Sequence, residues 1–167
     1  MNAIDPINSD ISTDTYAIHT NKLNLWYGTF QALFDIDLDI KKGMITSMIG
    51  PSGCGKSTYL RSVNRINERL GYVRIEGTIE VFNQNIYDPE VELVQVRKHV
   101  GMVFQRPNPF PQSIFDNGAF GPRVLGLGRG SAVQDIVEQS LRDATLWDEV
   151  KDVLEEPGTG LSGGQQQ

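Results

Sequence analysis

The sequence predicts an α/β fold, and three observations lead to this prediction. Residues 16–40 carry apolar side chains at alternate positions, which is typical of half-exposed strands. A glycine-rich loop at residues 50–55 separates an apolar segment from one with helical periodicity. Residues 131–150 show an amphipathic helical pattern. We therefore expect a β-rich N-terminal part that is followed by a helical part.

Size and composition fit one domain. The chain has 167 residues, of which 39% are hydrophobic and 22% charged, and its formal net charge is −6. This charge argues against a nucleic-acid partner, because such proteins usually present a basic face. Cys54 is the single cysteine, which excludes an internal disulfide and suits a reducing compartment. The sequence has no apolar run of about 18 residues and no cationic, apolar leader, so we expect a cytosolic protein.

The N-terminal part is expected to start with a flexible, polar and acidic stretch at residues 1–15. Antiparallel strands are predicted within residues 16–28 and 34–40, and a further alternating strand within residues 77–86. In the second strand, one face is predicted to carry Phe34, Ile36, Leu38 and Ile40, and the other face Asp35, Asp37 and Asp39.

Two other segments, residues 44–50 and 99–105, are continuously apolar and predict buried strands. Between them, residues 56–70 change to a helical period, and Gly71 is predicted to end the helix. The apolar stripe of this helix is expected to consist of Leu60, Val63, Ile66 and Leu70.

The second half begins with a proline-rich segment. Residues 106–123 hold four of the eight prolines, and we expect an irregular connector there, because proline removes a hydrogen-bond donor and fixes φ. A helix is predicted from Ser131, which is a typical N-cap residue. Its expected apolar stripe consists of Val133, Ile136, Val137, Leu141 and Ala144.

The strongest motif is "GPSGCGKST" at Gly50–Thr58, which fits the pattern G-x-x-x-x-G-K-[ST] between a predicted strand and a predicted helix. A triphosphate concentrates negative charge, and glycines let backbone N–H groups wrap around it. The helix that begins near Lys56 would direct its unpaired N–H groups at the phosphates. A glycine-rich turn that merely precedes a helix is the alternative. The context favours nucleotide binding.

Each motif residue has an expected role. Lys56 would neutralise the β- and γ-phosphates, and the Ser57 hydroxyl would ligate Mg²⁺. Cys54 is interpreted as a small residue that fits beneath a phosphate, although a redox thiol is the alternative. The predicted nucleotide contacts are Gly50, Pro51, Ser52, Gly53, Cys54, Gly55, Lys56, Ser57 and Thr58.

Hydrolysis needs a second carboxylate that holds Mg²⁺, normally at the end of another apolar strand. After Gly55 the sequence has no four apolar residues followed by Asp and Glu, and "TLWDEV" at residues 145–150 belongs to a helical pattern. We therefore expect no catalytic residue in this chain.

Three further features resemble the ATP-binding subunits of ABC transporters: Tyr27 in "WYG", Gln105 in "GMVFQ", and "LSGGQ" at Leu161–Gln165. The resemblance implies ATP and Mg²⁺ as cofactors. It implies that Tyr27 stacks on adenine, where a core tyrosine is the alternative, and that Gln105 reaches Mg²⁺.

The same resemblance gives "LSGGQ" a role between two copies of the chain. Ser162, Gly163, Gly164 and Gln165 would form a helix start that faces the γ-phosphate bound by a second subunit. The partner it implies is therefore a second ATP-binding subunit in a head-to-tail homodimer. A purely structural N-cap is the alternative.

Longer segments, such as "GMVFQRPNPFPQSIFDN" and "LWDEVKD", look like the ATP-binding proteins of phosphate importers of the Pst type. This resemblance runs over residues 17–167. It implies phosphate import, two transmembrane permease subunits that bind Arg106–Asn117, an extracytoplasmic phosphate-binding protein and a place on the cytoplasmic face of the inner membrane. Phe110 and Phe115 are either exposed contacts for the permease or packed under the loop.

The expected architecture is thus an α/β P-loop NTPase of ABC type. Its nucleotide-binding core with an antiparallel β subdomain is placed at residues 16–105, and the start of a helical subdomain at 106–167. The resemblance implies that an intact member of the family is an ATP hydrolase that couples ATP hydrolysis to phosphate import. Because the family's acidic strand is not found in this sequence, we expect an incomplete core sheet and a truncated chain that is inactive alone. Gly118, where an aliphatic residue is expected, and the flexible-looking segment 155–160 depart from the family.

Two other functions stay open. The chain is a non-hydrolysing nucleotide-binding module, or it is a soluble ABC-type ATPase that does not act in transport. The acidic charge and the proline-rich segment argue against the last of these.

Overall fold

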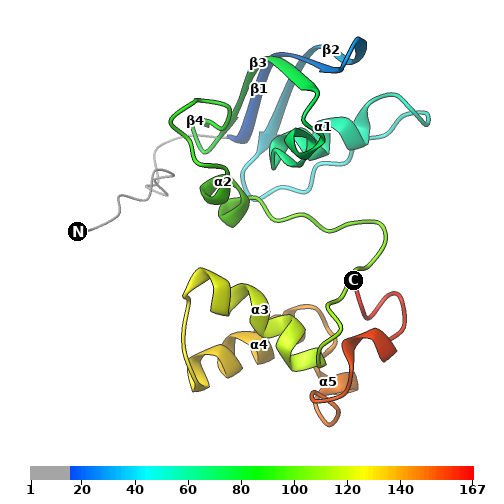
Figure 1. The fold of residues 1–167 in the computed structure, drawn as a ribbon, viewed down its shortest axis with the longest axis vertical. Coiled ribbons are helices and arrows are strands. Elements are labelled where there is room, and N and C mark those ends of the chain that lie inside the picture. The colour runs from blue at the N-terminus through cyan, green and yellow to red at the C-terminus, as the bar shows by residue number, and fades with distance from the viewer. Residues whose placement is uncertain (1–15) are drawn as a thin grey trace. The chain divides into compact units, whose positions relative to one another are not determined.

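The computed structural model describes residues 16–167, and its chain divides into two compact units at Met102–Val103 (Figure 1). The expected flexible stretch 1–15 lies outside the described residues. The first unit contains an antiparallel sheet and short helices, and the second contains helices and loops. No helix formed by residues 16–167 is long and apolar enough to cross a bilayer.

The sheet has four strands, β1 (Tyr16–Tyr27), β2 (Phe30–Lys41), β3 (Val73–Val81) and β4 (Gln84–Asn85), in the order β2-β1-β3-β4. β1 and β2 form a hairpin through Gly28, whose positive φ of 58° suits a tight turn. All pairs in this sheet are antiparallel, as the alternation in the sequence predicts.

A bulge in β2 corrects the predicted face of the strand. Leu23 and Leu25 of β1 pair with Ile36 and Leu33, so β2 has one extra residue between the two pairs, and Asp35 has a positive φ of 49°. Leu33 therefore takes the buried position, and Phe34 turns outward with 64% of its surface exposed. The other predicted core-facing residues of the strand are half-buried, namely Ile36, Leu38 and Ile40.

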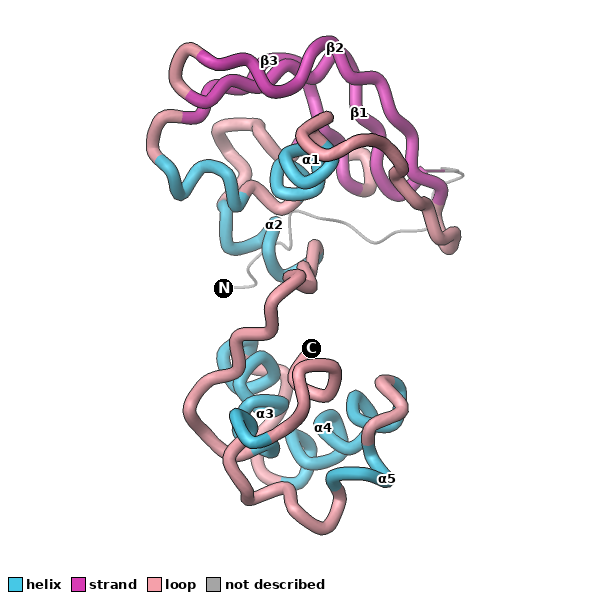
Figure 2. The backbone as a smooth tube through the Cα atoms, turned by 90° about the vertical axis from the view of Figure 1, so that its right-hand side faces the viewer, coloured by secondary structure: helices cyan, strands magenta, loops and turns pink. Residues whose placement is uncertain are grey.

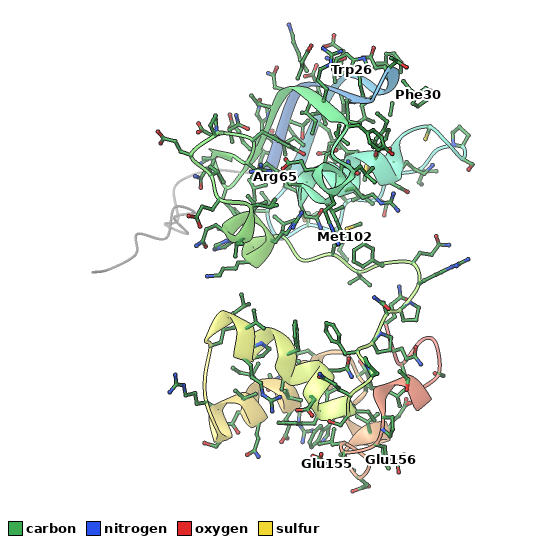
Figure 3. The ribbon with its side chains drawn as sticks, in the orientation of Figure 1. Trp26, Phe30, Arg65, Met102, Glu155 and Glu156 are labelled. Carbon is green, nitrogen blue, oxygen red and sulfur yellow. The ribbon has the colours of Figure 1, made fainter. Side chains whose placement is uncertain are left out.

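The predicted helix over 56–70 is interrupted. α1 spans Lys56–Val63, and a 3-10 helix, η1, spans Ile66–Leu70. Arg65, which is labelled in Figure 3, lies between them. It adopts a left-handed φ of 58°, which ends the α-helical hydrogen-bond pattern. Gly71 ends η1 in the left-handed conformation, so the predicted stop is confirmed.

This interruption changes the expected stripe, because Leu60 and Leu70 are half-exposed while Tyr59 and Val63 are buried. The core of the first unit is formed by the sheet, α1, α2 and the segment between β4 and α2. Its buried members are Leu23, Leu25, Leu33, Tyr59, Val63, Ile79, Val81, Ile86, Val91 and Val96.

The predictions of buried strands at 44–50 and 99–105 are wrong for the described structure. Residues 44–50 form an extended loop in which Ile45 and Ile49 are 98% and 96% exposed. The second segment contains the end of α2 (Leu93–His99) and then a loop. A continuously apolar strand is buried only when strands pair with both of its edges, and no described strand pairs with either segment.

The second unit contains α3 (Ile114–Leu125), α4 (Ser131–Asp143), α5 (Trp147–Val150) and a short 3-10 helix, η2 (Gly158–Gly160) (Figure 2). The expectation of an irregular connector is therefore wrong from residue 114 onward. Ser113 caps α3 by accepting a 3.0 Å hydrogen bond from the Asp116 amide at its hydroxyl. Pro122 lies inside α3, where it has no N–H group to donate to the carbonyl of Gly118 four residues earlier.

The structure of this unit explains both places where the sequence departs from the family pattern, Gly118 and residues 155–160. A Cβ on Gly118 would lie 3.2 Å from Val137 Cγ1, so glycine allows α3 and α4 to approach closely. Segment 155–160 is held in place, because the Ile114 amide donates to the Glu156 carbonyl and the Gly158 amide donates to the Gln112 carbonyl, both at 2.9 Å. The small core of the unit contains Ala119, Val133 and Val137, with Phe115 and Leu141 against them.

One predicted cap is misplaced. Gly130, with a φ of 58°, is the N-cap residue of α4, and Ser131 is the first residue of the helix. The serine hydroxyl makes no capping hydrogen bond within the described structure. A serine next to a glycine gives an ambiguous N-cap signal, which only the backbone conformation resolves.

Candidate nucleotide-binding site

The loop that precedes α1 depends on glycine. Gly53 and Gly55 have φ values of +82° and +95°, which residues with a side chain rarely adopt. A Cβ on Gly55 would also lie 2.7 Å from Leu33 Cδ2 and 3.2 Å from the Ala32 carbonyl oxygen. The loop is therefore packed directly against β2, which fixes the start of α1 relative to the sheet.

Lys56 places its ammonium group inside this loop. Its Nζ donates to the carbonyl oxygens of Gly50 and Pro51, each at 2.7 Å, and lies 3.3 Å from Cys54 Sγ. The loop carbonyls thus hold one positive charge at the centre of the glycine-rich turn. This arrangement places a cation where an anionic ligand of the loop would bind.

The N-terminus of α1 faces the same loop. Gly55 is its N-cap residue and has no side chain to satisfy the first N–H groups, and no acidic side chain lies in the first turn. These groups and the helix dipole favour an anion at this end. Ser57 is exposed in the first turn, and its hydroxyl is a suitable ligand for Mg²⁺, which keeps several waters and binds few protein oxygens.

The residues present fit a phosphate chain with its magnesium ion. The nine residues Gly50–Thr58 are together in one loop and helix start, as the motif predicts. Cys54 is exposed beside the Lys56 ammonium group. A Cβ on Gly50 would lie 2.9 Å from the Cys54 sulfur, so the small residues at both positions keep this loop compact.

Tyr27 ends β1 in the same unit and is half-buried against the core. Its hydroxyl donates to Asn67 Oδ1 at 3.1 Å, and its ring makes an edge contact with Tyr72, with centroids 6.4 Å apart. These contacts fit the core-tyrosine alternative and also leave part of the ring accessible. Stacking of Tyr27 on adenine stays a prediction.

The remaining predicted site residues lie in the second unit. Gln105 is exposed in the loop before α3, and its contact with Mg²⁺ stays a prediction. Ser162 and Gln165 form a reciprocal cap, in which the Ser162 amide donates to Gln165 Oε1 at 2.9 Å and the Gln165 amide approaches Ser162 Oγ at 3.5 Å. Gly163 and Gly164 lie exposed in the turn that this cap begins.

Sequence reasoning missed Asn67, which is 2% exposed and contacts both Tyr27 and α1. A polar residue in a helical pattern is ordinarily assigned to the solvent side, so periodicity gave no reason to single it out. The available signal was local: Asn67 follows the loop motif closely enough to pack against the helix that carries it.

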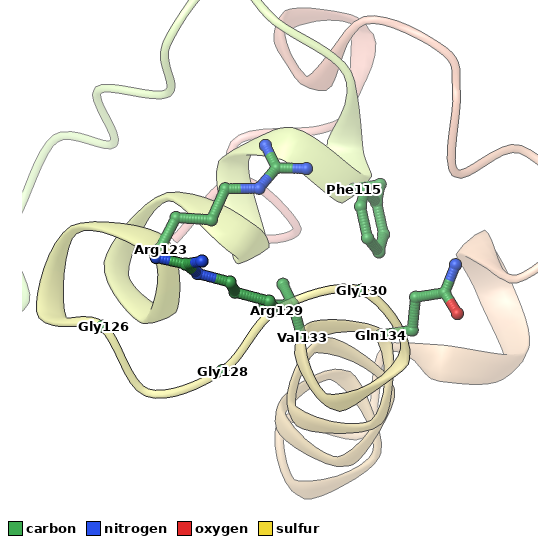
Figure 4. Close-up of a pocket in the computed structure, with 8 residues that line it drawn as sticks. All are labelled: Phe115, Arg123, Gly126, Gly128, Arg129, Gly130, Val133 and Gln134. Carbon is green, nitrogen blue, oxygen red and sulfur yellow. The ribbon is translucent and has the colours of Figure 1, made fainter.

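The second unit also contains a cavity of about 670 Å³. In Figure 4 the side chains of Arg123 and Arg129 lie on one side of it, and Phe115 and Gln134 on the other. Arg123 is already paired with Asp116 at 2.7 Å and holds the pKa of that carboxyl below its usual range. The cavity contains none of the residues that the sequence predicts for nucleotide binding.

The glycine loop, its enclosed lysine and the open helix start define a domain of the P-loop class. Residues 33–167 match the family model described as ABC transporter, and the chain belongs to this family. Its fold is the ABC-type P-loop NTPase fold, of which the chain forms a partial domain with the antiparallel β subdomain and helices. The predicted fold class is therefore confirmed.

Many solved structures, among them the following two, have a similar fold. The chain is similar to cbiO1 from Clostridium perfringens, which is part of the ABC transporter complex cbiONQ, with 26% identity and a TM-score of 0.68 over 92% of this chain and 58% of that chain. It is also similar to a bacterial Atm1-family ABC exporter with ATP bound, with 24% identity and a TM-score of 0.69 over 93% of this chain and 26% of that chain. The chain thus spans 58% of the length of the cbiO1 chain.

Proposed function

We propose that this chain binds MgATP at Gly50–Thr58 and forms the nucleotide-binding part of an ABC importer for inorganic phosphate. The observation that carries the nucleotide site is the Lys56 ammonium group, which the Gly50 and Pro51 carbonyls hold inside the glycine loop at the start of α1. On binding, the phosphates replace these carbonyls as partners of the ammonium group, because a charged acceptor makes the stronger hydrogen bond.

The chemistry of each side chain determines the role that we propose for it in binding MgATP. The backbone amides of the loop and Lys56 hold the phosphate oxygens, Ser57 holds Mg²⁺, and Gln105 completes the site around the ion. Tyr27 contributes stacking to the adenine base. We propose hydrolysis of the bound ATP as the reaction of the family; it needs a further acidic group beside Mg²⁺, a role to which we assign no residue of this sequence.

A second copy of the chain is the proposed partner across the nucleotide. Ser162, Gly163 and Gly164 begin a helical turn whose cap is formed by Gln165. Backbone N–H groups at such a turn attract an anion, which supports a contact with the γ-phosphate held by the other copy. ATP would then join two subunits head to tail.

The permease subunits are proposed to bind the segment Arg106–Asn117. Phe110 is 44% exposed, and its ring contacts that of Phe120, with the ring centroids 4.5 Å apart. Phe115 packs against the core of the second unit. Phe110 is therefore the apolar contact that we propose for the permease, on the cytoplasmic face of the inner membrane. Import of phosphate, and supply by an extracytoplasmic phosphate-binding protein, are supported by the sequence resemblance alone.

The nucleotide site is tested by calorimetric titration with MgATP. The unaltered protein is expected to bind, and Lys56→Ala is expected to weaken binding more than about tenfold, because a charged hydrogen-bond donor to the phosphates is lost. Lys98→Ala removes an exposed lysine on α2 and serves as the control, which should bind like the unaltered protein. Equal heats for all three proteins would contradict the proposal.

The importer assignment is tested separately by reconstitution. The protein should co-purify with two membrane subunits, and vesicles that contain the complex should accumulate phosphate in preference to sulfate when ATP is present on the side of this protein. Nucleotide binding without any membrane partner would favour the non-transport alternatives.

A further inference from the structure

A partly buried hydrogen-bond network joins Tyr27 to α1, the helix that follows the phosphate loop. The Tyr27 hydroxyl donates to Asn67 Oδ1 at 3.1 Å. Asn67 Nδ2 in turn donates to the Thr58 carbonyl and to Ser62 Oγ, each at 3.0 Å. Asn67 and Ser62 are 2% and 0% exposed, so the hydrogen bond between their side chains is buried, and the bonds of Asn67 to Tyr27 and to the Thr58 carbonyl are partly buried.

The partners fix the orientation of the Asn67 amide. The Thr58 carbonyl oxygen can only accept a hydrogen bond, so the amide NH₂ group must face it. Asn67 Oδ1 is then left as the acceptor for the Tyr27 hydroxyl, and the Tyr27 proton has one favourable direction. Ser62 Oγ donates to the Thr58 carbonyl at 2.8 Å and so completes the network on α1.

The network connects the two ends of the proposed nucleotide site. Thr58 is the last residue of the phosphate-binding motif, and Tyr27 is the residue proposed to stack on the base. Tyr72 makes an edge contact with the ring of Tyr27, and the Tyr72 carbonyl accepts a 2.9 Å hydrogen bond from the Gly28 amide. Between the two ends lies the single side chain of Asn67.

We propose that Asn67 is a positioning residue, which holds the Tyr27 ring at a fixed place relative to the phosphate loop so that base and phosphates bind together. The proposal rests on the proposed nucleotide site. A ring that is placed in advance loses less conformational freedom when adenine binds. Without the network the loop still holds phosphates, and only the contribution of the base is weakened.

The experiment compares MgATP with magnesium inorganic triphosphate, which has no base, as calorimetric probes. Tyr27→Phe keeps the ring but removes the hydroxyl, and Asn67→Leu removes the amide at similar volume. Each variant should bind MgATP about fivefold more weakly, the effect of one ordinary hydrogen bond, and should bind triphosphate like the unaltered protein. The double variant should be no weaker than the weaker of the two single variants, because both remove the same link.

Tyr87→Phe is the matched control. Tyr87 also donates a partly buried hydrogen bond to α1, at 2.8 Å to the Ser62 carbonyl, but it makes no hydrogen bond of its own to Asn67 or Tyr27 in the described structure. Loss of this hydrogen bond in Tyr87→Phe should lower the melting temperature of the protein. It should not change the ratio of the affinities for MgATP and for magnesium triphosphate. If Asn67→Leu does not fold, the comparison of Tyr27→Phe with Tyr87→Phe still shows whether the hydrogen bond between Tyr27 and Asn67 strengthens binding of the base.

The outcomes separate the two proposals. Equal weakening of MgATP and triphosphate, or unchanged MgATP binding in Tyr27→Phe, would overturn the positioning role of Asn67 while the nucleotide site stands. A protein that binds neither probe would overturn the nucleotide site itself, and the positioning role with it.

Discussion

At the scale of single residues, position 55 sets two requirements that only glycine meets. Its φ of +95° excludes most side chains, and its Cα faces Leu33 and the Ala32 carbonyl in β2. The sequence motif predicts a glycine there for the sake of the phosphate. The structure adds a second reason, since the same glycine seats the loop on the sheet.

Gly55→Ala is expected to lower the free energy of unfolding by about 2–4 kcal/mol, because the left-handed backbone and the clash with β2 both add cost. Gly53→Ala is the matched variant, since Gly53 has a φ of +82° but no described atom within 4 Å of a new Cβ. It should lose only about 1–2 kcal/mol. Urea unfolding measures both, and an equal loss in the two variants would refute the role of the contact with Leu33.

At the scale of elements, periodicity predicts the strands and helices better than their ends. The alternation of β1 and β2 and the stripe at Val133 and Val137 are both present in the structure. The bulge at Asp35 and the left-handed residue Arg65 are not visible in the pattern. Each shifts the following side chains to another face, because one extra or differently turned residue changes the register.

The assignment of Ser113 as the N-cap of α3, and of Gly130 instead of Ser131 as the N-cap of α4, can be tested by two substitutions. Ser113→Ala should cost about 1 kcal/mol of stability, because the hydrogen bond to the Asp116 amide is lost. Ser131→Ala should change the stability by less than about 0.5 kcal/mol, because this serine lies inside α4 and caps nothing in the described structure. Thermal and urea unfolding measure both effects. Equal costs would show that Ser131 is a cap after all.

At the scale of the whole molecule, the described chain consists of two units with separate cores. The proposed nucleotide loop lies in the first, and the turn at Ser162–Gln165 in the second. If that turn contacts the phosphates of a second copy, MgATP should convert monomers to dimers.

A substitution in the turn at Ser162–Gln165 tests whether this turn takes part in the MgATP-dependent dimer. Gly164→Glu should abolish the MgATP-dependent dimer in analytical ultracentrifugation, because a carboxylate would face the γ-phosphate. The control is Gly160→Glu, which adds the same charge at an exposed glycine before the turn. Neither glycine has a positive φ, and no described atom lies within 4 Å of either new Cβ, so both variants should fold. Dimers that persist in Gly164→Glu would count against the contact between copies.

The phosphate loop and the antiparallel strands could be predicted because their signals are local. The loop needs glycines and a lysine at fixed spacing, and a half-exposed strand needs a period of two. Residues 44–50 could not be predicted in the same way. An apolar run indicates that the segment prefers burial, but whether it is buried depends on strands that pair with it, and no described strand does so.

The sequence by itself determined the class of fold, the phosphate-binding loop and the membership of the family, since all three rest on residue types at short spacings. Only the tertiary structure decided which residues surround that loop: the contact of Gly55 with β2, the break at Arg65, and the place of Asn67 between Tyr27 and Thr58. The physical reason is distance along the chain. Asn67 and Tyr27 are 40 residues apart, and their hydrogen bond exists only after packing has brought β1 and η1 together.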